Sequence, residues 1–218
     1  MAEVFSRLLS LEIPPGQSAF LWGARKTGKS TLLRSAFPRS LTYDFLKTDL
    51  ALSFGARPAL LREQLLARSA DALSEPIILD EVQKVPGVLD EVHWLIEHRR
   101  LRFILCGSSA RKLRHGAANL LAGRLVEASM PPFLAGELGE AFSLARALQI
   151  GLVPLIWAAE DPQATLAAYA SLYLQEEVQA EALVRQIGDF SRFLEVISFS
   201  QGCQLNLAAL GQIGRAHV

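Results

Sequence analysis

Short, mostly apolar runs recur along the first 130 residues and predict the strands of a sheet. Runs of this length are typical of strands that are covered on both faces, as in parallel sheets with helices on either side. The runs cover residues 18–22, 76–80, 101–106 and 125–130. Helical patterns lie between and after them, so the chain is predicted to have an α/β fold.

Apolar residues at helical spacing predict the helices. Residues 88–96 place five aliphatic side chains on one face: Val88, Leu89, Val92, Leu95 and Ile96. Further helices are predicted over residues 31–37, which Pro38 ends, over residues 137–149, and from Asp161 to about Ile187. Pro154 and Pro162 mark breaks between helices.

Composition excludes several classes of protein. The 218 residues carry 22 Lys and Arg against 22 Asp and Glu, which argues against a globally basic nucleic-acid coat. Two cysteines cannot form a disulfide framework. The first 15 residues do not resemble a signal peptide, and the longest apolar run, residues 150–159, is too short and broken to span a bilayer. We therefore expect a cytoplasmic protein without a membrane partner.

Candidate chemistry begins directly after the first predicted strand. Residues 23–30, GARKTGKS, match the pattern GxxxxGK[ST] between a strand and a helix. The glycines let successive backbone N–H groups point at a phosphate, and the helix N-terminus adds partial positive charge. Lys29 is expected to reach the β- and γ-phosphates of ATP, and the Ser30 hydroxyl to coordinate Mg²⁺. The alternative is a glycine-containing turn with a solvated lysine.

The predicted nucleotide-binding residues run through this segment: Gly23, Ala24, Arg25, Lys26, Thr27, Gly28, Lys29, Ser30 and Thr31.

A second candidate strand ends in two carboxylates, Asp80 and Glu81. Parallel strands in open α/β sheets deliver such residues to the edge where ligands bind. Asp80 would hold Mg²⁺, directly or through its water, and Glu81 would orient and deprotonate the attacking water. The alternative is an ordinary strand end that runs into a polar turn. Glu81 favours an ATP-hydrolysing enzyme over a small-molecule kinase, which does not need a residue that activates water. The sequence lacks the NKxD-type motif that recognises guanine in GTPases, so a GTPase is not favoured.

Two further candidates follow the third predicted strand. Ser108 or Ser109 could hydrogen-bond the γ-phosphate or the attacking water, and could also cap the next helix, since the two roles are compatible. Arg124 precedes the strand at 125–130 and could act as an arginine finger on a neighbouring subunit's nucleotide. The alternative is that Arg124 pairs with an acid such as Glu127 and only orients this strand. The segment from Arg99 to Arg124, with both ends included, holds seven Lys or Arg and no Asp or Glu, which indicates either a nucleic-acid-facing patch or a solvated face.

The motifs GARKTGKS, IILDEVQKVPGVLDEVHWLI, RFILCGSSARKLR and LLAGRLVEASMPPFLAGEL, in this order, resemble the prokaryotic AAA-type ATPases over residues 1–211. The resemblance implies a P-loop NTPase fold with a five-stranded parallel sheet flanked by helices. It implies that Lys29, Ser30, Asp80 and Glu81 carry the ATP chemistry, with Ser108 as the sensor and Arg124 as the arginine of a GR pair.

More narrowly, the chain resembles the branch of this family with a DEVQK-type acidic strand, a GSS-type sensor and a GR pair before the last strand of the sheet. Members of this branch usually carry a C-terminal domain with a winged-helix-like start. Residues 189–198 resemble its first helix and residues 205–210 the start of its second, but the chain ends at Val218. We therefore expect this chain to be a truncated member of the family. A full-length member could bind DNA, but this chain is not expected to recognise it.

The predicted organisation is an ATPase core over residues 1–136, a helical lid-like segment over 137–187 and an incomplete winged-helix-like segment over 188–218. The predicted function is that of an ATP- and Mg²⁺-dependent ATPase module, which could share its sites between identical subunits through Arg124. The alternative is a nucleotide-dependent interaction or DNA-binding protein with little turnover. What ATP hydrolysis would serve does not follow from the sequence.

Overall fold

The computed structural model describes residues 5–108, 125–173 and 187–199, together with residues 202, 204, 206 and 208. The chain divides into two compact units, residues 1–159 and residues 160–218. The division into an ATPase core, a lid-like segment and an incomplete winged helix stays a prediction. Among the described residues, no helix is both long and apolar enough to cross a membrane.

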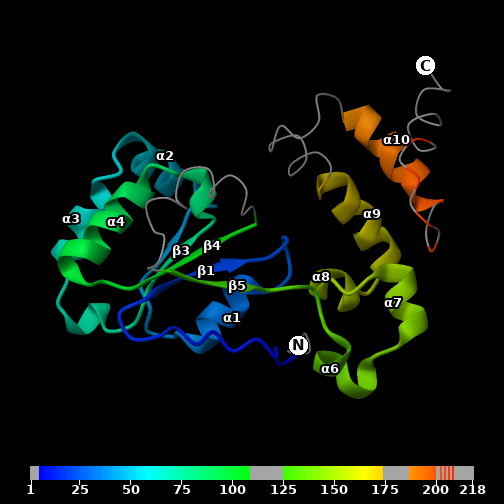
Figure 1. Cartoon of the computed structure of the whole chain (residues 1–218), viewed down its shortest axis with the longest axis horizontal. Coiled ribbons are helices and arrows are strands. Elements are labelled where there is room, and N and C mark those ends of the chain that lie inside the picture. The colour runs from blue at the N-terminus through cyan, green and yellow to red at the C-terminus, as the bar shows by residue number, and fades with distance from the viewer. Residues whose placement is uncertain are drawn as a thin grey trace. The chain divides into compact units, whose positions relative to one another are not determined.

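The first unit is built on a five-stranded parallel sheet (Figure 1). The strands are β1 Ser18–Trp22, β2 Thr42–Asp44, β3 Ile77–Asp80, β4 Phe103–Gly107 and β5 Leu125–Ser129. Their spatial order is β2-β3-β4-β1-β5, so β1 lies inside the sheet between β4 and β5. This confirms the predicted α/β class with a five-stranded parallel sheet and the P-loop NTPase fold.

Helices and 3₁₀ turns connect and extend these strands. In the first unit they are α1 Lys29–Ala36, α2 Thr48–Ala56, α3 Leu60–Leu66, η1 Asp71–Leu73, η2 Val82–Lys84, α4 Val88–Arg99, α6 Ala135–Leu138, η3 Gly139–Ala141, α7 Leu144–Ile150 and α8 Pro154–Trp157. Among the described residues of the second unit, the helices are α9 Pro162–Tyr173 and α10 Ile187–Ser198.

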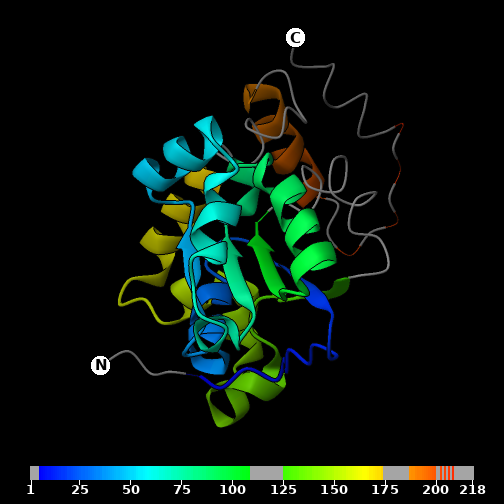
Figure 2. The ribbon, with the colours of Figure 1, turned by 90° about the vertical axis from the view of Figure 1, so that its left-hand side faces the viewer.

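Each face of the sheet has its own apolar core, because successive side chains of a strand point to opposite faces. On one face, Phe20 and Trp22 of β1 pack with residues from α2, α3 and α4, the layer that faces the viewer in Figure 2. On the other face, Leu21 of β1 packs with Leu33 of α1 and with residues that precede β1. The sheet is thus the middle of three layers. Its inner strands β1, β3 and β4 are buried along their whole length, whereas the edge strands β2 and β5 are only partly buried.

Several elements differ from the prediction. Strand β2 and helices α2 and α3 come from a stretch for which no element was predicted from residue patterns. The single helix predicted over residues 137–149 is wrong, because α6, η3 and α7 replace it. Gly139 breaks it with φ 52° and ψ −124°, a conformation that favours glycine. Ser143 then starts α7, its hydroxyl accepting a hydrogen bond from the Arg146 amide at 3.3 Å.

The prolines were predicted correctly as helix boundaries. Pro154 occupies the first turn of α8, and Pro162 begins α9, where the missing N–H of proline costs no hydrogen bond. The predicted first winged-helix helix coincides with α10, whereas residues 205–210, as a segment, lie outside the described residues. The winged-helix assignment therefore stays a prediction.

Candidate nucleotide-binding site

The glycine loop after β1 closes around the side chain of Lys29. Thr27, which is fully buried, donates from its hydroxyl to the carbonyl of Ala24 at 2.9 Å. Lys29 is 6% exposed, and its ammonium donates to the carbonyls of Gly23 and Ala24 at 2.6 and 3.0 Å. The loop thus holds a buried cation among its own backbone dipoles. The predicted role of this loop in binding a phosphate stays a prediction.

Two residues of the loop adopt positive φ angles, Lys26 at 63° and Gly28 at 96°. Glycine takes this conformation at no steric cost, whereas a lysine is strained in it. Gly28 is also the residue that caps α1, and its carbonyl accepts from the amide of Leu32 at 2.9 Å. The N-terminus of an eight-residue helix therefore opens directly from the loop, which adds partial positive charge there.

Gly23 is required for a different reason, the close approach of the neighbouring strand. A Cβ atom on Gly23 would lie well inside contact distance of the Met130 carbonyl oxygen and 3.1 Å from the Thr27 hydroxyl. The amide of Met130 in turn donates to the carbonyl of Trp22 at 2.6 Å. The first glycine of the loop is therefore packed against the end of β5.

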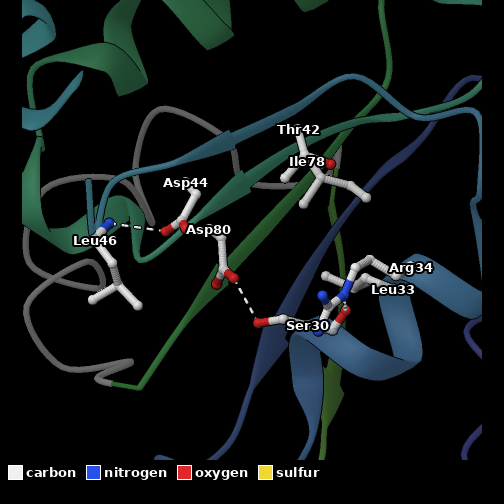
Figure 3. A pocket seen from close by; sticks show the side chains of 8 residues that line it. All are labelled: Ser30, Leu33, Arg34, Thr42, Asp44, Leu46, Ile78 and Asp80. Atoms are coloured by element: carbon white, nitrogen blue, oxygen red, sulfur yellow. Dashed lines mark hydrogen bonds between the residues drawn. The ribbon is translucent and has the colours of Figure 1, made fainter. Parts of the chain in front are cut away.

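Asp80 and Ser30 meet across the edge of the sheet. Asp80 shares its strand face with Ile78, and this face carries α1. The Ser30 hydroxyl donates to Oδ2 of Asp80 at 2.6 Å (Figure 3). The other carboxylate oxygen accepts from the amide of Glu81 at 3.0 Å. The two residues predicted to hold a metal thus lie in direct contact.

Glu81 follows in a strained backbone conformation. Its φ of 55° and ψ of 41° lie in the left-handed region that non-glycine residues rarely adopt. Such outliers cluster at functional sites, where the surroundings enforce them. The side chain is buried, and Oε2 accepts hydrogen bonds from the side-chain amide of Gln83 and, at 3.4 Å, from the Ser108 hydroxyl.

Gln83 links the two predicted residues, and sequence analysis assigned it no role. Its Nε2 donates to Glu81 and also to the Ser108 hydroxyl at 3.2 Å, while its Oε1 is buried without a partner. Rotating the side-chain amide of Gln83 by half a turn would place its oxygen against the Glu81 carboxylate, where neither group could donate a hydrogen bond. The carboxylate therefore determines the orientation of this amide. The only available signal was its position in the DEVQK segment, three residues after Asp80.

A cavity of about 200 Å³ opens beside Ser30 and Asp80 (Figure 3). Arg34 of α1 and Asp44 of β2 contribute to its lining. Asp44 lies in register with Asp80 and accepts the amide of Leu46 at 2.9 Å. In the described part of the chain, no group of three or more His, Cys, Asp and Glu could hold a metal ion.

Cys106 lies in register with Asp80 on the adjacent strand. Burial is the main cause that raises the pKa of this thiol far above its usual value, and the Asp80 carboxylate raises it further. The side chain therefore remains a protonated thiol at neutral pH and packs as an apolar group.

The other predicted site residues are only partly covered by the structure. Thr31 is exposed at the start of α1. Ser109 and Arg124 lie outside the described residues, as do Arg111, Lys112 and Arg114 of the basic run. Of the described part of this run, Arg99 and Arg100 are exposed at the end of α4, and Arg102 donates to the carbonyl of Ser74 at 2.7 Å.

The chain is similar to a known family of domains and to a solved structure. A family model described as an AAA domain matches residues 16–139, more than half of the chain. Among solved structures, the chain is similar to the Orc1 protein of Aeropyrum pernix in complex with DNA, with 18% sequence identity and a TM-score of 0.40. This match covers 78% of the chain but only 56% of the Orc1 chain. No curated protein matches.

The contact between Gly23 and Met130 leads to a stability prediction. We expect Gly23→Ala to lower the free energy of unfolding by about 1–3 kcal/mol, because the new methyl group must displace backbone rather than a flexible side chain. Guanidinium denaturation without nucleotide measures this.

The matched control is Gly55→Ala in α2, where a Cβ meets nothing within 4 Å. This substitution should instead stabilise the chain by about 0.4–1 kcal/mol. A Gly23→Ala variant as stable as the wild type would contradict the close approach of the loop and β5.

Proposed function

The chain belongs to the family of AAA domains, which are nucleotide-binding modules, and we propose that it binds ATP with Mg²⁺ and hydrolyses it. The observation that carries the proposal is the 2.6 Å hydrogen bond between Ser30 and Asp80. It joins the segment that bears Lys29 to the end of β3, directly before Glu81. Phosphate binding, metal binding and water activation would therefore occur within one small region.

Lys29 and the loop would bind the phosphates. The Lys29 ammonium bonds to two carbonyls of its own loop, and phosphate oxygens are stronger acceptors for it than neutral carbonyls because they are charged. The amides of Gly23 to Thr31 and the N-terminus of α1 would supply the remaining donors.

Ser30 and Asp80 suit Mg²⁺. The ion prefers oxygen ligands and usually takes only one or two from the protein, with waters and phosphates completing the shell. A hydroxyl and a carboxylate in contact offer that donor set. When bound, Mg²⁺ would neutralise charge on the β- and γ-phosphates.

Glu81 would act as the general base on the attacking water. Its Oε2 is already engaged by Gln83 and Ser108, and these bonds would orient the carboxylate. Ser108, at the end of β4, lies close enough to Glu81 to transmit the presence of a γ-phosphate to it. This contact supports Ser108 as the sensor, and Ser109 lies outside the described residues.

Arg124 is proposed as the arginine finger of a homo-oligomer. An arginine supplied by one subunit to the nucleotide of the next would stabilise charge in the transition state. Hydrolysis would then require two subunits.

We predict that Lys29→Ala abolishes ATP binding, because the site loses the cation that faces the phosphates. Isothermal titration calorimetry with ATP measures the loss. Lys47→Ala, which removes an exposed lysine at the start of α2, should leave the affinity unchanged. Equal affinity of Lys29→Ala and wild type would contradict the nucleotide-binding assignment.

Glu81→Gln should retain ATP binding and lose turnover by roughly 10²–10⁴-fold, because the amide fits the same space but accepts no proton. Steady-state phosphate release and calorimetry separate the two effects. Glu63→Gln, at an exposed ion pair with Arg57, is the matched control. Hydrolysis by Glu81→Gln at the wild-type rate would favour the alternative, in which nucleotide binding serves an interaction and Glu81 is not the base.

Arg124→Ala should leave ATP affinity nearly intact and lower turnover by roughly 10³–10⁵-fold. An equimolar mixture of Arg124→Ala and Glu81→Gln should regain activity, because some interfaces combine an intact finger with an intact base. The exposed Arg99→Ala is the control substitution. A mixture no more active than its components, at concentrations where the wild type is active, would exclude a finger acting between subunits.

A further inference from the structure

The segment that precedes β1, residues 5–13, lies along the first unit in an alternating pattern. Its odd-numbered residues are half-buried and its even-numbered residues are exposed. Leu9, Leu11 and Ile13 pack against the apolar core beneath α1. Alternation with a period of two is typical of an extended chain with one face covered. Arg7 is the only charged residue in the covered row.

The Arg7 guanidinium contacts three separate parts of the fold. Its Nη1 donates to the carbonyl of Thr27 in the glycine loop at 2.5 Å. Its Nη2 donates to the carbonyl of Pro131 after β5 at 2.7 Å, and its Nε donates to Oε1 of Glu137 at the start of the helical region at 2.9 Å. One side chain thus ties the loop, the end of the sheet and α6 together.

Glu137 is the anionic partner of Arg7, and the side chain of Glu137 is 1% exposed, against 9% for that of Arg7. Burial by itself would raise the pKa of Glu137. Hydrogen bonds from the amides of Leu134 and Leu8 and from Arg7 outweigh burial and hold that pKa below its usual value. The carboxylate is therefore ionised at neutral pH, and the buried pair is fully charged.

The bond to Thr27 fixes more than one atom of the loop. The peptide between Thr27 and Gly28 is planar and trans, so its N–H points opposite to its C=O. Holding the Thr27 carbonyl against Arg7 therefore aims the Gly28 N–H away from Arg7. Gly28 has a φ of 96° and could adopt other conformations if the carbonyl were released.

We propose that Arg7 is a positioning residue for the phosphate-binding loop: it holds the peptide of Thr27 and Gly28 in the orientation that presents the Gly28 N–H to a nucleotide phosphate. The choice of phosphate as the ligand rests on the proposed function. The inferred role of Arg7 in orienting the peptide does not depend on the proposed function, because it follows from the contacts of Arg7.

An arginine suits this role and a lysine does not. Arg7 uses each of its three nitrogen atoms on a different acceptor group, and its planar fork holds these directions simultaneously. The guanidinium also lies over the ring of Phe133, 5.3 Å from its centre, and Phe5 packs edge-on against the same ring at 5.2 Å. A single ammonium would keep the charge but could not satisfy the same three directions.

Hydrogen exchange of the full chain without nucleotide tests the positioning directly. In Arg7→Ala and Arg7→Lys, amides of residues 23–30 should exchange faster, while those of β3 and β4 keep their wild-type protection. Arg39→Ala, which removes an exposed ion pair with Glu75, should change neither. Where Arg7→Ala fails to fold, Arg7→Lys and Glu137→Gln provide the same comparison.

Calorimetry with ATP then measures the consequence for binding. We expect Arg7→Ala and Arg7→Lys to bind ATP roughly 5- to 150-fold more weakly than the wild type, the range typical of coupling between separate sites. Arg39→Ala should bind as the wild type does.

Two outcomes would overturn the inference. In one, the loop keeps its wild-type protection while only residues 5–13 exchange faster; in the other, all strands lose protection equally, which would make Arg7 an anchor of the whole fold. If the wild type itself bound no ATP, the proposed function would fail, but the exchange experiment would still decide whether Arg7 orders the loop.

Discussion

The parallel register of β1, β3 and β4 is the constraint on which the candidate site depends. Asp80 lies opposite Cys106, and Cys106 lies opposite Leu21, one residue before the end of β1. Three strands from distant parts of the sequence therefore end at the same level. Since side chains alternate between faces, a shift of one residue in β3 would turn Asp80 away from α1 and Ser30. The buried apolar residues on both faces resist that shift, so the cores specify the chemistry at the edge.

Two adjacent buried carboxylates at this edge need compensation, because an unpaired buried charge is strongly unfavourable. Asp80 accepts from the Ser30 hydroxyl and from the Glu81 amide, and Glu81 accepts from Gln83 and Ser108. The left-handed backbone at Glu81 allows this division, since it turns the chain sharply between the two residues. Each carboxylate thus has its own donors, which is consistent with separate tasks in metal binding and water activation.

The sequence predicted most of the elements that bear the candidate site, because these elements are specified locally. An apolar run followed by GARKTGKS predicts the strand, loop and helix, and the run before Asp80 predicts β3. Strand β2 was missed because its three residues carry too little pattern, and the helix over 137–149 was predicted as continuous although Gly139 interrupts it. The roles of Gln83 and Arg7 could not be predicted, since they depend on contacts that appear only once the strands are paired.

The residues that hold the loop in place are more widely separated in the sequence than the residues of the loop itself. Arg7 and Glu137 are 130 residues apart, and Arg7 precedes the residues 16–139 that match the AAA domain. A motif of eight residues can specify which groups face a phosphate. Its peptides, however, need partners elsewhere to remain in strained or glycine-dependent conformations. Residues 5–13 supply one such partner through Arg7, whose guanidinium has acceptors in the loop, after β5 and in α6. The conformation of the loop therefore depends on residues before β1, after β5 and in α6, which lie far from the motif in the sequence.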